Sequence, residues 1–345
     1  MVKSGVTAVD LFCGAAGLSA GLKESGIDVV AGIDFDPACR YPFEENIGAK
    51  FVEADVVTLK SEDVSDLFGL SSVRLLAGCA PCQPFSGYTT ARKVSDSRWQ
   101  LLMEFLRIAL DVRPELITME NVPRLRHLSL WTDFVGSLKE AGYKIDWGVV
   151  NAADYGVPQS RTRLVMMGSL LGEISLPKPV KGKPITARAA IGSQPPMQAG
   201  ERNLTDPLHS SRALTPLNVA RIKSSRPAGT NRDWPDELRV ECHRGKNVRY
   251  PSVYGRMSWD KPAPTMTTQF YGYGNGRFGH PDQDRAITLR EGALLQSFPQ
   301  DYKFVPPGAR ISFTEIGRLI GNAVPPALGK EIGAAFISHV SQAAR

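Results

Sequence analysis

The sequence has few of the residues that build disulfide frameworks or metal centres. Among 345 residues there are only five cysteines and five histidines. Five cysteines, an odd number in a long chain, argue against a disulfide framework. Cys242-His243 is the only Cys/His cluster besides the C-x-x-C of Cys79 and Cys82, and two half-clusters so far apart make a weak case for zinc. We therefore expect no metal site.

Long apolar runs are also absent. No window approaches the ~18 uninterrupted apolar residues that a membrane-spanning helix needs. The N-terminal "MVKSGVTAVDLF" runs directly into a strand-like segment, without the pattern of a secretory signal. A composition of 42% hydrophobic and 22% charged residues is ordinary for a globular enzyme. These features predict a cytoplasmic protein with no membrane partner.

Negative charge is scarce in one part of the chain. The net charge is +6, and residues 179–310 contain 20 Lys and Arg against 11 Asp and Glu. The remainder contains 21 basic and 24 acidic residues. A basic excess confined to one segment is expected where that segment faces a polyanion, although a solvated basic surface would give the same count.

The first ~170 residues alternate strand-like and helix-like segments. Such alternation predicts βαβ units and a mostly parallel sheet. The expected strands are 6–12, 28–34, 73–78, 115–122, 143–150 and 161–169, and the expected helices are 17–26 and 99–112. Gly26 suits the left-handed position that ends a helix.

The pattern changes near residue 178. "PKPVKGKP" is a Pro/Lys-rich connector, and the following segment is irregular, with aromatic residues beside basic ones. A helical pattern returns after 310. We expect one domain formed by 1–178 plus 311–345 and a second, smaller and irregular domain at 179–310, because a chain of this length exceeds the usual single core.

Glycines and acids follow successive strands near the N-terminus. The first strand leads into "DLFCGAAGLSAGL", a Gly-containing turn before a helix. Asp34 ends the second strand, twenty residues after Gly14, and Asp55 follows a plausible third strand. Carboxylates in such places can accept the ribose hydroxyls or the adenine amine of a nucleotide cofactor. The F-x-G-x-x-G spacing suits S-adenosylmethionine at least as well as NAD, while a fold that uses its glycines only for turning remains the alternative.

The stretch "GCAPCQPFSG" (78–87) contains both cysteines of the C-x-x-C pair. A redox dithiol normally begins a helix, which lowers the pKa of its first thiol. Here Pro84 and Gly87 follow and break any helix. A flexible loop after the second cysteine fits a nucleophile better, so Cys82 is the candidate nucleophile and Cys79 a small buried residue.

Six motifs recur in order along the chain: "DLFCGAAG", "GCAPCQPFS", "MENV" (119–122), "PQSRTR" (158–163), "RAITLREGALLQSFP" (285–299) and "IGNAVPP" (320–326). With these motifs the chain resembles the DNA (cytosine-5)-methyltransferases of bacterial or phage type. The resemblance covers most of the chain outside about 170–260. The sequence departs from the family pattern at Cys79 and Ala16, which replace glycines, at Asp34, where glutamate is commoner, and at Leu319, which replaces glutamine.

The resemblance implies an S-adenosylmethionine-dependent, Rossmann-like methyltransferase fold with a target-recognition domain. It also implies a catalytic set of Cys82, Glu120, Arg161 and Arg163. Cys82 would add to carbon 6 of cytosine, because carbon 5 is too weak a nucleophile to attack a methyl sulfonium unaided. Glu120 would hydrogen-bond the exocyclic amine and nitrogen 3. Arg163 would bind the cytosine carbonyl, whereas Arg161 would rather brace the loop.

The same resemblance predicts the cofactor and DNA contacts. The cofactor-binding set is Asp10, Phe12, Gly14, Gly17, Asp34, Phe35, Asp55, Val56, Pro81, Leu101, Asn322 and Ala323. The DNA-binding set is Ser86, Tyr88, Arg98, Arg163, Arg244, Lys246, Arg249 and Arg256, with 83–98 as a lid over a flipped base.

The predicted partner is double-stranded DNA, bound by a monomeric, nucleoid-associated enzyme. A restriction endonuclease that cuts the same site is a further candidate partner. Three other functions fit parts of the sequence. A tRNA cytosine-5 methyltransferase would share the chemistry, but its Cys-Phe-Thr signature is absent. A catalytically silent DNA-binding protein would not need the full catalytic set, and a thiol–disulfide oxidoreductase would use only the cysteine pair.

Overall fold

The computed structural model describes residues 5–81, 100–241, 244 and 253–344. The chain divides into two compact units. The first unit comprises Met1–Tyr155, Thr162–Val180 and Ala323–Arg345, and the second comprises Gly156–Arg161 and Lys181–Asn322. In the part of the chain that the structure describes, no helix is both long and apolar enough to cross a membrane.

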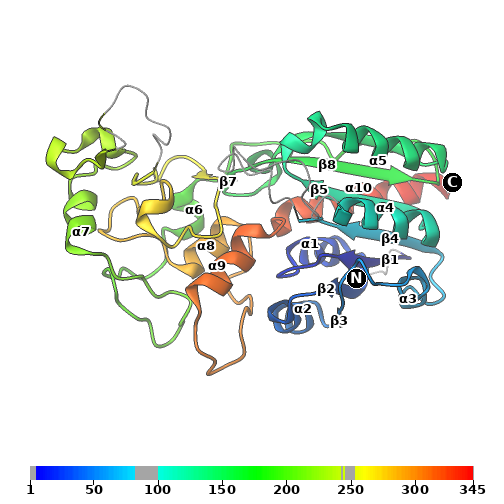
Figure 1. The fold of residues 1–345 in the computed structure, drawn as a ribbon, viewed down its shortest axis with the longest axis horizontal. Coiled ribbons are helices and arrows are strands. Elements are labelled where there is room, and N and C mark those ends of the chain that lie inside the picture. The colour runs from blue at the N-terminus through cyan, green and yellow to red at the C-terminus, as the bar shows by residue number, and fades with distance from the viewer. Residues whose placement is uncertain (1–4, 82–99, 242–243, 245–252, 345) are drawn as a thin grey trace. The chain divides into compact units, whose positions relative to one another are not determined.

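A seven-stranded sheet in the order β3-β2-β1-β4-β5-β8-β6 forms the centre of the first unit (Figure 1). The five strands from β3 to β5 are parallel, and β8 runs antiparallel to both β5 and β6. The prediction of a mostly parallel sheet is therefore confirmed. The strands are β1 (Val6–Leu11), β2 (Asp28–Asp34), β3 (Lys50–Glu53), β4 (Val73–Gly78), β5 (Leu116–Asn121), β6 (Lys144–Asn151) and β8 (Thr162–Ser169).

Apolar runs explain the central strands. Every residue of β5 is buried, and β1 and β4 are nearly so, because helices cover both faces of a parallel sheet. Successive side chains of β1 point to opposite faces of the sheet. Val9 and Leu11 belong to a large core cluster, whereas Asp10 contacts Ser19 of α1. The helices are α1 (Gly17–Ser25), α2 (Arg40–Ile47), α3 (Ser61–Leu67), α4 (Gln100–Val112), α5 (Ser129–Glu140) and α10 (Pro326–Ala343).

That core cluster joins the sheet to α3, α4 and α5. Its aromatic centre stacks Trp131 on Phe134 at 5.5 Å between ring centroids, with Phe105 at 6.2 Å from Phe134. Burying each such ring contributes about 1.5–3 kcal/mol to folding. This packing supports the sheet, at whose edge the parallel strands end.

Helix α1 meets α10 at backbone distance. A Cβ at Gly21 would overlap the carbonyl oxygen of Pro326 and lie 2.5 Å from the nitrogen of Lys330. Lys330 Nζ also donates to Glu24 Oε1 at 2.6 Å. Helix α1 ends as predicted, with Gly26 in the left-handed conformation (φ 100°). The C-terminal helix therefore covers the first helix of the chain.

The second unit has little regular structure. Its elements are β7 (Gln159–Ser160), β9 (Ala263–Pro264), α6 (Ala187–Ile191), α7 (Pro216–Lys223), α8 (Leu289–Leu295) and α9 (Phe313–Asn322). Short 3-10 turns occur in both units, at Pro37–Cys39, Pro123–His127, Ala152–Tyr155, Asn231–Asp233, Asp236–Leu238 and Tyr273–Asn275. The boundary expected at 311 precedes α9, but α9 packs against α8 and belongs to this unit.

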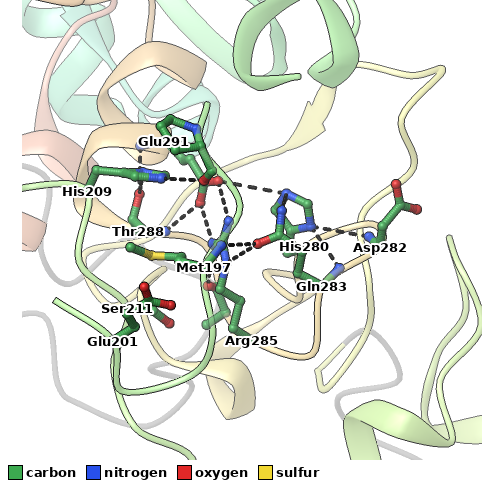
Figure 2. Close-up of polar contacts among 12 residues, drawn as sticks. Met197, Glu201, His209, Ser211, His280, Asp282, Gln283, Arg285, Thr288 and Glu291 are labelled. Carbon is green, nitrogen blue, oxygen red and sulfur yellow. Dashed lines mark hydrogen bonds and ion pairs between the residues drawn. The ribbon is translucent and has the colours of Figure 1, made fainter. Parts of the chain in front are cut away.

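Buried polar contacts take the place of a large apolar core in part of this unit (Figure 2). Arg285 donates from both terminal nitrogens to the two oxygens of Glu291, each at 2.7 Å, and both side chains are fully buried. Thr288 and Glu291 form a capping box at the start of α8. His209 contacts Thr288 Oγ1 at 3.2 Å, which ties the segment before α7 to this helix.

Candidate active site

The site is built where the parallel strands of the first unit end. Strand order reverses between β1 and β4, which lead to opposite sides of the sheet. Leu11, the last residue of β1, lies beside Gly78, the last residue of β4. In open α/β sheets, ligands bind outside the carboxyl ends of the strands at such a reversal.

The turn after β1 has an unusual backbone. Phe12, Gly14 and Ala16 all have positive φ, at 57°, 53° and 60°. Gly14 suits this conformation without strain, and its missing side chain leaves the turn open. Gly14 N donates to Asp34 Oδ2 at 3.0 Å, and Asp36 N donates to Asp34 Oδ1 at 3.0 Å. The Asp34 carboxylate thus joins the turn to the end of β2.

Asp10 lies behind this turn. Its side chain is buried, and Ser19 Oγ donates to Asp10 Oδ2 at 2.6 Å. Burial raises the pKa of Asp10 to about 7. The carboxyl group of Asp10, which was predicted to contact the cofactor, thus supports the turn from within the protein in this structure.

The other predicted cofactor residues differ in exposure. Phe35 is 66% exposed directly after Asp34, an unusual place for a large aromatic ring unless a ligand covers it. Asp55 is exposed, with Oδ1 accepting Val57 N at 3.0 Å. Val56, by contrast, is buried in the core cluster, so only its main chain could face a ligand.

The remaining members of that set lie in different places. Phe12 packs partly against the core cluster, Gly17 begins α1, and Leu101 is half-buried in α4. Pro81 is exposed and is the last residue described after β4. Asn322 is exposed at the end of the second unit, and Ala323 is buried at the start of the last segment of the first unit.

Glu120 is the central acid of the candidate site. Its side chain is 4% exposed near the end of β5, and Arg163 Nε lies 2.8 Å from Oε1. The direction of that N–H is not aligned for a hydrogen bond, and among the described residues Oε1 is buried without a hydrogen-bond partner. A buried carboxylate oxygen without a donor is costly unless a ligand supplies one. Glu120 and Arg163 are therefore brought together as predicted for the catalytic set.

The neighbouring asparagine fixes the chain after β4. Asn121 Nδ2 donates to the carbonyl oxygen of Ala80 at 3.1 Å, and its Oδ1 accepts Val122 N at 2.8 Å. Ala80 and Pro81 immediately precede Cys82, which lies outside the described residues, as do Ser86, Tyr88, Arg98, Lys246 and Arg249.

Arg161, predicted in the catalytic set and expected there to brace the loop, belongs to the second unit and is buried. Its Nη1 donates to the carbonyl oxygen of Met266 at 3.2 Å and its Nη2 to that of Gly321 at 3.0 Å. Arg161 is therefore a bracing residue, because two of its guanidinium nitrogens donate to main-chain carbonyl oxygens of the second unit.

Arg256, a predicted DNA contact, has a buried side chain in this structure. It pairs with Asp284 and donates to four main-chain carbonyl oxygens, those of Ile222, Ser225, His280 and Gln283. Arg244 is exposed. Gln269 and Arg277, which were not among the predicted DNA contacts, are exposed and alternate with buried Phe270, Tyr271, Tyr273 and Phe278. This alternation was visible in "QFYGYGNGRF".

Comparison with known proteins decides the family. The model of the C-5 cytosine-specific DNA methylases matches residues 6–338. The chain belongs to this family. The type II methylase M.HgiDII of Herpetosiphon aurantiacus is 45% identical over 330 residues, which cover 94% of this chain and 93% of that protein. The type II methyltransferase M1.HphI of Haemophilus parahaemolyticus is 32% identical, over 96% and 87% of the two chains.

Solved structures show the same fold. A DNA modification methyltransferase encoded within an E. coli prophage matches this methylase with a TM-score of 0.75 at 23% identity, over 97% of this chain and 99% of that one. The Dnmt2 methyltransferase of S. pombe matches with a TM-score of 0.66 at 19% identity, over 97% and 98%. The family model and the type II relatives show that the protein is a DNA (cytosine-5)-methyltransferase, as predicted, which methylates carbon 5 of cytosine in DNA. The family uses S-adenosylmethionine.

Proposed function

We propose that this methylase transfers a methyl group from S-adenosylmethionine to a cytosine flipped out of a specific double-stranded DNA sequence, through a covalent adduct with Cys82. The observation that carries the proposal is Glu120, buried beside Arg163 with Oε1 lacking a hydrogen bond among the described residues. The exocyclic amine of a cytosine is the donor that this oxygen needs. A base inside a duplex cannot reach such a position, so flipping is required.

The chain's own residues then divide the chemistry. The Cys82 thiolate adds to carbon 6, which places electron density on carbon 5. Glu120 holds the amine and shares a proton with nitrogen 3, and Arg163 binds the base carbonyl. After methylation, a water molecule takes the carbon-5 proton, the electrons of that C–H bond re-form the double bond between carbons 5 and 6, and the bond from carbon 6 to sulfur breaks to release Cys82 as a thiolate.

The residues at the ends of β1 and β2 fit an adenosine cofactor. Asp34 can accept the ribose hydroxyls, Asp55 the adenine amine, and the exposed ring of Phe35 can cover the base. Gly14 keeps the turn open for close approach. S-adenosylmethionine would supply an electrophilic methyl group at this place.

The second unit is proposed to bind DNA. The predicted segment 179–310 carries 20 basic against 11 acidic residues. Exposed Arg244 suits phosphate, whereas exposed Gln269 and Arg277, anchored between buried aromatic residues, have the side chains that read adenine and guanine edges. The two relatives, which are both named as type II enzymes, support a role in protecting a site from a cognate restriction endonuclease. That the enzyme is monomeric and cytoplasmic stays a prediction from the sequence.

Trapping with a modified substrate tests the proposal. Duplex DNA with 5-fluorocytosine at the target should form a complex stable to denaturing electrophoresis only when S-adenosylmethionine is present, because fluorine cannot leave carbon 5 as a cation. The modified peptide should contain Cys82. Cys82→Ala should abolish trapping and keep cofactor binding, and Glu120→Gln should slow trapping strongly. An adduct on Cys79 or Cys242, or methylation of tRNA in preference to duplex DNA, would refute the proposal.

A further inference from the structure

Strand pairing brings a second cysteine to the catalytic glutamate. Gly78 of β4 lies beside Met119 of β5, so the next residues, Cys79 and Glu120, are also neighbours. Cys79 Sγ donates to Glu120 Oε2 at 3.0 Å. Cys79 N lies 3.4 Å from the carbonyl oxygen of Leu11, which keeps the chain in line with the sheet. The contact therefore follows from the register of two central strands.

The two oxygens of Glu120 have different surroundings. Oε2 accepts the thiol of Cys79, and Oε1 lies beside Arg163 without a hydrogen bond among the described residues. A carboxylate held at one oxygen cannot exchange its two oxygens by rotation without breaking that contact. The thiol therefore determines which oxygen remains available to a ligand.

We infer that Cys79 is a positioning residue for methyl transfer, which holds Glu120 with Oε1 directed to the base. This inference rests on the proposed function of Glu120. The glycine that usually occupies this place in the motif has no side chain for such a contact. Because a thiol is a weak donor, it orients the carboxylate without competing strongly for it.

Variants of Cys79 separate this role from packing. Cys79→Ala should lower kcat for methyl transfer about fivefold, the loss expected for one hydrogen bond of ordinary net strength, because the thiol is a weak donor. The KM for DNA and the Kd for S-adenosylmethionine should not change. Cys79→Ser keeps a donor and should restore at least half of the wild-type kcat. Cys39→Ala, which removes a buried thiol elsewhere in the first unit, is the matched control and should match wild type.

A double-mutant cycle gives the decisive measurement. Once Glu120→Ala has removed the partner, adding Cys79→Ala should cause no further loss of the residual rate. Equal kcat for wild type and Cys79→Ala, failure of the serine variant, or independent losses in the double variant would each overturn the inference. Absence of a 5-fluorocytosine adduct in the wild-type enzyme would instead refute the proposed function. The thermal unfolding of each variant is measured as well, to check that the variant is folded under the conditions at which its kcat is determined.

Discussion

At the scale of single residues, position decides what an arginine does. Arg161 and Arg163 are two residues apart, yet one is buried against main-chain carbonyls and the other lies beside Glu120. A guanidinium group can donate hydrogen bonds to two carbonyl oxygens at once, because its N–H donors are held in a rigid planar fork. A lysine in the same place supplies a single point charge. The two arginines should therefore respond differently to the same substitution.

We predict that Arg163→Lys lowers the rate of methyl transfer at least tenfold, by about 1.4 kcal/mol or more of transition-state stabilisation, with little change in Tm. Arg161→Lys should instead lower the free energy of unfolding by about 1–3 kcal/mol, because one carbonyl oxygen loses its donor. Single-turnover kinetics and urea unfolding of both variants test this. The reverse pattern would return Arg161 to the catalytic set.

At the scale of secondary-structure elements, glycine sets the distance between α1 and α10. We predict that Gly21→Ala lowers the free energy of unfolding by about 1–3 kcal/mol, because the new methyl group meets the backbone of Pro326 and Lys330. Gly136 lies within α5 and has nothing within 4 Å of an added Cβ. Gly136→Ala should therefore raise stability by about 0.5–1 kcal/mol. Equal effects at both positions in urea unfolding would contradict the close approach of the two helices.

Helices and strands could be predicted from the sequence where the pattern of apolar residues reflects which side chains are buried. The strands at 28–34 and 73–78 have the predicted bounds, and Gly26 ends α1 as expected. Motif spacing also placed Glu120 with Arg163. A count of charged residues could not show that Arg256 is buried. Its guanidinium group donates to main-chain carbonyl oxygens, and every residue type has such an oxygen, so the composition does not reveal the contact. The contact of Cys79 with Glu120 depends on strand register, which becomes known only when the sheet is built.

At the scale of the whole molecule, the polar core of the second unit makes folding sensitive to acid. His280 Nδ1 accepts the backbone N–H groups of Asp282 and Gln283, at 3.2 and 3.0 Å, so the ring is neutral (Figure 2). Burial lowers the pKa of His280 to about 4. Glu291 faces the ring at 3.8 Å; burial acts to raise the pKa of Glu291, but the contacts with Arg285 outweigh it and lower that pKa.

The lowered pKa of His280 makes the stability of the protein depend on pH. The pKa is 6.5 in the unfolded chain and about 4 in the folded chain, so between pH 6.5 and pH 4 the unfolded chain binds the proton more readily. Stability from His280 is therefore present above pH 6.5 and lost as the pH falls towards 4. We predict that His280→Asn, which keeps an acceptor but cannot titrate, is less stable than wild type at pH 7 and that the difference narrows by pH 5. Urea unfolding at both pH values measures this, and a constant difference would show that folding does not lower the pKa of His280.

The contact between α1 and α10 also constrains the order of events during synthesis. Roughly 300 residues separate the end of α1 from the start of α10, and the second unit is encoded between them. At about 5–20 residues per second, a ribosome needs roughly 15–60 s to produce that interval. During this time the glycine-bearing face of α1 has no partner from its own chain. The first unit therefore cannot finish folding until the ribosome has released α10, the helix that covers α1.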